Sequence, residues 1–139
     1  MSDITLDQAD AVVEGTLDAA GQAGAPPIAV VVLDRAGHVV AVKRQDGATM
    51  FRFDVALGKA WGAAAFGQHS SELAAKAAKN PNFFAALSAT SQGRLLPNPG
   101  GLVIHNAEGQ LIGAVGVSGD SGTNDEMYAR AGVKSANLS

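Results

Sequence analysis

The chain has no cysteine, no excess of positive charge and no long aliphatic run, and each absence excludes a class of function. Without cysteine it forms no disulfide and offers neither a thiolate nucleophile nor a sulfur ligand for a metal. Ten Lys and Arg against 13 Asp and Glu give a net charge of -3, so no basic field is available to hold a nucleic-acid backbone. The longest aliphatic run, IAVVVL at 28–33, is too short to cross a bilayer. We expect partners other than nucleic acid or membrane.

What the sequence does contain is a large apolar fraction, rich in alanine and glycine. The 139 residues match the size of one ordinary domain, and 47% of them are hydrophobic, which is enough for one core. We therefore expect a single domain over residues 1–139. The first ten residues, MSDITLDQAD, lack the basic and apolar regions of a signal peptide, and together with the absence of cysteine they predict a cytoplasmic location.

The hydrophobic pattern predicts two similar hairpins among helices. IAVVVLDRAGHVVAVKR and GLVIHNAEGQLIGAVGV both read as strand, turn, strand, and apolar residues recur at helical spacing elsewhere. The expected elements are a helix over 5–20 opened by a Thr5–Gln8 capping box, a hairpin over 28–44, a helix over 50–66, a shorter helix near 72–78, a single helical turn within 83–101, a hairpin over 101–117 and a last helix that starts near Asn124. The order helix, hairpin, helices, hairpin, helix favours an α+β fold with one antiparallel sheet.

The stretch GAVGVSGDSGTNDE, residues 113–126, admits three interpretations. Its GDSG resembles the nucleophile loop of trypsin-like proteases, but that chemistry needs a histidine base and an orienting acid, and no AAHC-like segment surrounds any histidine. The glycine spacing also departs from the phosphate-binding motifs. Thr123 and Glu126 have capping-box spacing, so we expect a tight turn from a strand into a capped helix.

Three histidines, His38, His69 and His105, are the candidate ligands for a metal or haem. None has the spacing of a zinc site, so we expect no protein-bound metal ion. His38 and His105 lie beside turns, and His69 is expected to end the long helix, where a cation would suit the helix dipole. His69 and His105 remain candidates for a single axial haem ligand.

Arg44, Asp54 and Lys59 are charged residues in an otherwise apolar region, and two interpretations stay open. They can be solvated surface charges. Alternatively, the hairpin end and the following helix form one wall of a pocket. Arg44 and Lys59 would then hold a carboxylate or propionate, and Asp54 would act as a base.

Three segments carry a family resemblance over nearly the whole chain. They are IAVVVLDRAGHVVAVKRQDGA, FDVALGKAWGAA and PNPGGLVIHNAEGQLIGAVGVSGDSGTNDEMYARAG. They resemble the GlcG/HbpS family, which also occurs as the carboxy-terminal domain of PduO-type proteins. The resemblance implies a profilin-like fold, an antiparallel sheet flanked by helices, and homo-oligomers that are often octameric. It implies haem binding for members similar to HbpS and a place in small-molecule catabolism for others.

Matched motif by motif, the resemblance also implies a pocket region. Its residues would be Arg44, Asp54, Lys59, Gly100, Gly101, Ser118, Gly119 and Asp125. The first functional hypothesis is an oligomer that binds haem or a related small ligand at an intersubunit pocket, with His69 or His105 beside it. The second is a cofactor-free isomerase, hydratase or decarboxylase acting on a small carboxylated metabolite, with Asp54 as base. The third is a structural or regulatory oligomer without a ligand.

Overall fold

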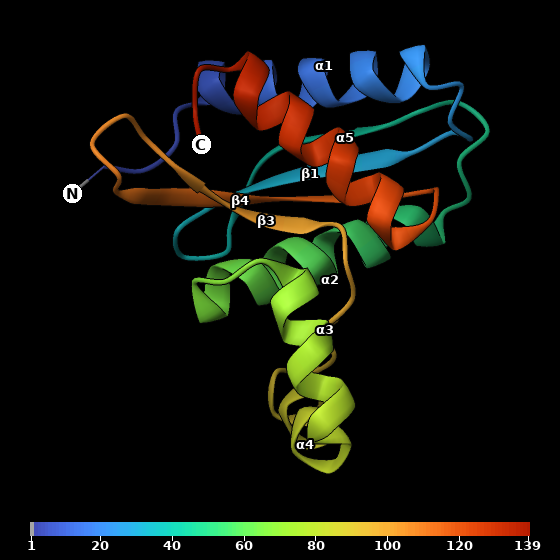
Figure 1. Ribbon diagram of the computed structural model, residues 1–139, viewed down its shortest axis with the longest axis vertical. Coiled ribbons are helices and arrows are strands. Elements are labelled where there is room, and N and C mark those ends of the chain that lie inside the picture. The colour runs from blue at the N-terminus through green and yellow to red at the C-terminus, as the bar shows by residue number, and fades with distance from the viewer. Residues whose placement is uncertain (1) are drawn as a thin grey trace.

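The computed structural model describes residues 2–139, and over that range five helices surround one four-stranded antiparallel sheet (Figure 1). The elements are α1 (Leu6–Gln22), β1 (Ala29–Asp34), β2 (Val39–Arg44), α2 (Phe51–Phe66), α3 (Ser70–Lys79), α4 (Pro81–Thr90), β3 (Gly101–His105), β4 (Leu111–Ser118) and α5 (Gly122–Ser135). This order confirms the α+β fold that the two hairpin patterns predicted.

The sheet has the strand order β2-β1-β4-β3, so the two hairpins meet through β1 and β4. Ala29 at the start of β1 lies opposite Ser118 at the end of β4. Figure 1 shows α1 and α5 on one face of the sheet and α2 on the other. Val30 and Val32 therefore pack in the cluster that includes α1 and α5 residues, and Val31 packs toward α2. Burial on both faces explains why β1 is almost continuously apolar.

The first helix begins and ends close to its predicted limits because its cap is encoded locally. Gln8 donates its backbone N–H to Thr5 Oγ1 at 3.1 Å, and the Gln8 side chain accepts from the Thr5 N–H at 2.9 Å. This confirms the capping box predicted from the sequence.

Two predictions about the later helices are wrong. Residues 81–90 form the helix α4 instead of a single helical turn, because Pro81 occupies the first helical position, where a missing N–H costs nothing. The last helix begins at Gly122, close to the expected start near Asn124, but its cap is Ser121, whose Oγ accepts from the Asn124 N–H at 3.2 Å. The capping box expected from Thr123 and Glu126 is therefore replaced by a cap that lies earlier in the chain.

Helices α3 and α4 extend away from the sheet as an arm (Figure 1). Leu73 of α3 and Phe84 of α4 are buried with Leu95 from the following loop, which gives the arm a small apolar cluster of its own. Within residues 2–139, no helix is both long and apolar enough to cross a membrane.

Candidate functional site

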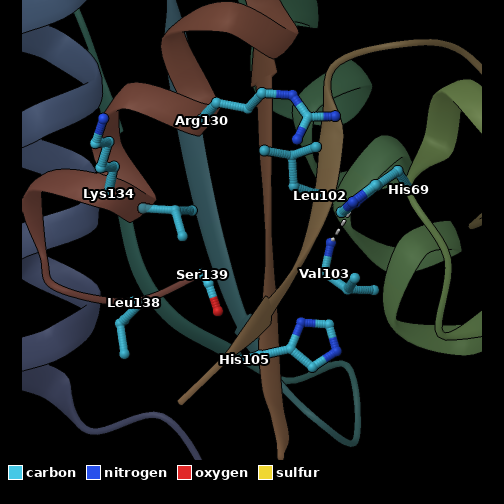
Figure 2. A pocket seen from close by; sticks show the side chains of 9 residues that line it. His69, Leu102, Val103, His105, Arg130, Lys134, Leu138 and Ser139 are labelled. Carbon is cyan, nitrogen blue, oxygen red and sulfur yellow. Dashed lines mark hydrogen bonds between the residues drawn. The ribbon is translucent and has the colours of Figure 1, made fainter. Parts of the chain in front are cut away.

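A cavity of about 380 Å³ lies between the edge strand β3, the second half of α5 and the segment just before α3 (Figure 2). Its volume falls within the range of pockets that hold small molecules. The residues that line it are His69, Leu102, Val103, His105, Arg130, Val133, Lys134, Leu138 and Ser139. Its walls are thus mainly apolar, and its polar groups are two imidazoles, two cations and one serine.

The outer edge of β3, which forms one wall, is closed by local hydrogen bonds. The Val103 N–H donates to His69 Nδ1 at 3.3 Å, the bond drawn in Figure 2. His105 and Ser139 exchange backbone hydrogen bonds, with the Ser139 N–H donating to the His105 carbonyl at 3.0 Å. Because these donors are satisfied within the chain, the edge is held in place and does not present a free strand for pairing.

His69 differs from its sequence-based prediction. It does not end the long helix; α2 ends at Phe66, and His69 stands directly before the first residue of α3. Its Nδ1 accepts a hydrogen bond, so the proton of the neutral ring lies on Nε2. Burial lowers the pKa of His69, and the nearby Arg130 guanidinium lowers it further. His69 is therefore a neutral ring that fixes the edge strand, not a cation at a helix end.

Arg130 and Lys134 are site residues that the sequence reasoning missed. They lie one turn apart on α5 with the buried Val133 between them, and Figure 2 shows them across the cavity from His105. Arg130 Nη2 lies 3.4 Å from Glu126 Oε2, and the Arg130 side chain is half exposed. The helical spacing of two cations was visible in the sequence, but the face that α5 turns toward β3 is set by packing.

The most buried charges of the described chain form an ion pair away from this cavity. Lys59 Nζ of α2 lies 3.1 Å from Asp125 Oδ2 of α5 and donates to the Val117 carbonyl at 2.9 Å. The two side chains are 3% and 1% exposed. Burial lowers the pKa of Lys59 and raises the pKa of Asp125, while their mutual attraction opposes both shifts. The pair links α2 to the first turn of α5, next to the end of β4, where Val117 lies.

Glycines allow the backbone to close over this ion pair. A Cβ at Gly100, where φ is +126°, would lie 2.7 Å from Lys59 Nζ, and one at Gly101 would lie 2.4 Å from the Lys59 carbonyl oxygen. Gly119 packs elsewhere, against the segment before β1, where a Cβ would lie 2.5 Å from the Pro27 carbonyl oxygen. Such distances are too short for any side chain, so these positions need glycine for packing.

Most of the residues expected in a pocket therefore lie in one packed cluster. Lys59 contacts Asp125, Gly100 and Gly101, and Ser118 and Gly119 directly follow Val117, whose carbonyl accepts from Lys59. Ser118 is 1% exposed, and the Lys59 ammonium is already bonded to the protein. Two of its three N–H groups bond to Val117 and Asp125, and the side chain is 3% exposed, so Lys59 is held inside the fold and not at a surface where it would clamp an anion.

Arg44 and Asp54, the other expected members of the pocket, lie apart from this cluster. Arg44 ends β2, donates to the Ala48 carbonyl and borders a shallow hollow with Gln45 and Asp46. Asp54 is an exposed residue in the first turn of α2. The structure thus does not bring Arg44, Asp54 and Lys59 to a common pocket.

Comparison with known proteins identifies relatives for this arrangement. A crystal structure of the Klebsiella pneumoniae protein ORFY superposes with a TM-score of 0.88 at 29% identity, over 99% of this chain and 92% of that one. A double mutant of Streptomyces reticuli HbpS gives a TM-score of 0.82 at 32% identity, over 96% of this chain and 87% of that one. A PduOC:haem complex gives 0.87 at 23% identity, over 99% and 97%, and shows the same fold.

The sequence match is equally extensive. The family described as "Haem degrading protein HbpS-like" matches residues 4–134, which is nearly the whole chain. This agrees with the resemblance carried by the hairpins and the FDVALGKAWGAA helix. The chain, with its sheet enclosed by α1, α5 and α2, belongs to the HbpS-like family.

Proposed function

We propose that the chain binds haem, or a closely related tetrapyrrole, in the cavity between β3 and α5. One observation carries the proposal: the cavity sets the imidazole of His105 across from the cations Arg130 and Lys134, on mainly apolar walls. Haem needs these three things, an axial ligand, partners for its propionates and apolar contact for its ring. The description of the family as haem-degrading supports the same ligand.

His105 is the better iron ligand of the two predicted histidines. The Nδ1 of His69 already accepts from Val103, which leaves its proton on the other ring nitrogen, and a protonated nitrogen has no lone pair for iron. Over residues 2–139, the His105 ring makes no hydrogen bond with the protein, so it is available to a ligand. We assign His69 to holding the β3 edge and His105 to the iron.

The α5 cations would orient the ligand. The Lys134 ammonium is exposed at the cavity, and the Arg130 guanidinium keeps N–H groups beyond the single weak contact with Glu126. Guanidinium and ammonium groups form charge-assisted bonds with carboxylates, which in haem are the two propionates. Leu102, together with Val133 from α5, would contact the macrocycle.

Bound haem would supply an iron centre with one position taken by the protein and another open to small molecules. The chain's own residues hold and orient that group and keep part of it out of water. A cavity of about 380 Å³ would hold only part of a four-ring macrocycle, so the rest of the macrocycle would stay exposed on a single chain. We propose that a second copy of the chain covers this exposed part, which makes the site intersubunit and the protein a homo-oligomer, in line with the octamer implied by the family resemblance.

Titration of the purified protein with hemin tests the assignment. We expect a saturable change of the Soret band at micromolar protein, a loss of at least about tenfold in affinity for His105→Ala, and a smaller loss for Arg130→Gln combined with Lys134→Gln. His38→Ala is the matched control, because the His38 side chain is 81% exposed in the β1–β2 turn, away from the cavity.

Two results would overturn the proposal. The first is the absence of any saturable Soret change in the wild-type protein, which would favour a ligand-free regulatory oligomer. The second is a His105→Ala protein that binds hemin with the same spectrum and affinity as the His38→Ala control. In that case the iron ligand lies elsewhere.

A further inference from the structure

A second hollow, of about 300 Å³, lies between α2 and the end of α4, and no residue of the proposed haem site lines it. Trp61, Phe66, Leu87 and Leu95 give it an apolar floor. Arg94 also lines it and is the one charged residue among the lining residues in the described chain. A single cation above an apolar floor is the arrangement that a small amphipathic anion requires.

Arg94 is held in one orientation before any ligand arrives. Its Nε donates to the Ser91 carbonyl at 2.8 Å, and its guanidinium carbon lies 4.7 Å from the centroid of the Trp61 ring. Stacking on an indole and one hydrogen bond fix the plane of the guanidinium. In residues 2–139, its terminal Nη groups have no protein partner, so two parallel N–H donors remain for a carboxylate.

The platform under Arg94 is fixed as well. A Cβ at Gly37, in the β1–β2 turn, would lie 3.2 Å from the Trp61 ring, so the turn packs closely against the indole. On the other side, the Leu95 N–H donates to Ser91 Oγ at 3.1 Å and Leu95 is buried. Neither the indole nor the loop that carries Arg94 has to be ordered by a ligand, which reduces the entropic cost of binding.

We propose that this hollow binds a small monocarboxylate with one apolar ring or short chain, with the carboxylate on Arg94 and the apolar part against the floor formed by Leu87 and Phe66. The volume is at the lower limit for small-molecule pockets, which suits a one-ring acid. A bare inorganic anion would use the guanidinium but leave the apolar floor exposed to water. The carboxylate and the apolar group are therefore both part of the recognition.

The single tryptophan of the chain makes the site directly observable, because Trp61 lies in it. We expect phenylacetate to change the Trp61 fluorescence saturably, in the millimolar range or tighter, while 2-phenylethanol, which lacks the carboxylate, binds at least about tenfold more weakly. Arg94→Gln should weaken phenylacetate binding at least about tenfold as measured by calorimetry, and Arg94→Lys should recover only part of the loss, because an ammonium cannot form the bidentate pair.

Lys79→Gln is the matched control, since it removes one exposed cation from the arm without touching the hollow. It should bind phenylacetate like the wild type. The proposal is overturned if phenylacetate causes no saturable change in the wild type, if the alcohol binds as well as the acid, or if Arg94→Gln and Lys79→Gln bind equally. None of these readouts involves haem, so the outcome is independent of the hemin titration.

Discussion

Removal of either charge of the buried pair, Lys59 or Asp125, should destabilise the fold more than the deletion of any other single charge in the described chain. Lys59 Nζ and Asp125 Oδ2 are 3.1 Å apart and both side chains are almost fully buried. At an effective dielectric constant of about 20, their attraction is about 5 kcal/mol at this distance. Lys59→Met removes that attraction and leaves a buried carboxylate without its partner, which typically costs about 3–5 kcal/mol.

A double-mutant cycle separates the pair from simple side-chain loss. Asp125→Asn alone leaves the Lys59 charge buried and should cost a similar amount, but the asparagine oxygen can still accept from the Asp120 N–H, as Asp125 Oδ1 does at 3.0 Å. In the double variant no buried charge remains. The residual cost is then the unpaired Val117 carbonyl, about 1 kcal/mol, and the coupling energy should exceed about 2 kcal/mol.

Chemical denaturation followed by circular dichroism measures these free energies of unfolding. Lys43→Met provides the control, because Lys43 pairs with Glu14 at the surface, where both side chains are more than half exposed, and its loss should leave the midpoint nearly unchanged. The reasoning fails if Lys59→Met loses less than about 1 kcal/mol, or if the two single losses simply add in the double variant.

Two further predictions concern His69, which bonds the edge strand β3, and Gly116, which packs against α2. The pKa of His69 is lowered in the fold below its ordinary 6.5, so near that pH the unfolded chain binds more protons than the folded one. The free energy of unfolding should therefore fall as the pH drops from about 6.5 toward the lower folded pKa. His69→Gln should remove this slope in thermal melts at different pH, and an unchanged slope would contradict the prediction. A Cβ at Gly116 would lie 2.0 Å from the Ala56 carbonyl oxygen of α2. Gly116→Ala should therefore lower the free energy of unfolding by about 1–3 kcal/mol or more. A loss below about 0.5 kcal/mol would show that α2 can move away from β4 to make room for the methyl group.

The hypothesis of a cofactor-free enzyme has less structural support than the haem proposal. Its proposed base, Asp54, is exposed, and its two clamps lie in different places: Arg44 at the end of β2 and Lys59 in a buried ion pair. Asp54 as a catalytic base stays a prediction. Its test is a comparison of wild type with Asp54→Asn on α-hydroxy, α-keto and aromatic acids.

The sequence determined the elements whose signals are local. Capping by Thr5 and Gln8 placed the first helix, and short apolar runs on either side of DRAG and NAEG placed both hairpins, because capping and turn signals act over a few residues. The family motifs also indicated the fold. Several of the matched residues are needed for packing, such as Gly100 and Gly101, where the backbone lies close against Lys59 and leaves no room for a side chain.

Only the tertiary structure decided which residues share a site. Lys59 and Asp125 are 66 residues apart and become neighbours because α2 and α5 meet at one end of the sheet. Arg130 joins His105 because packing turns one face of α5 toward the edge strand. Spacing along the chain carries no information about such contacts, since they depend on how each helix rotates to bury its apolar face. The sequence therefore indicated the family and the strands, and the packing decided which charges are buried in an ion pair and which line a cavity.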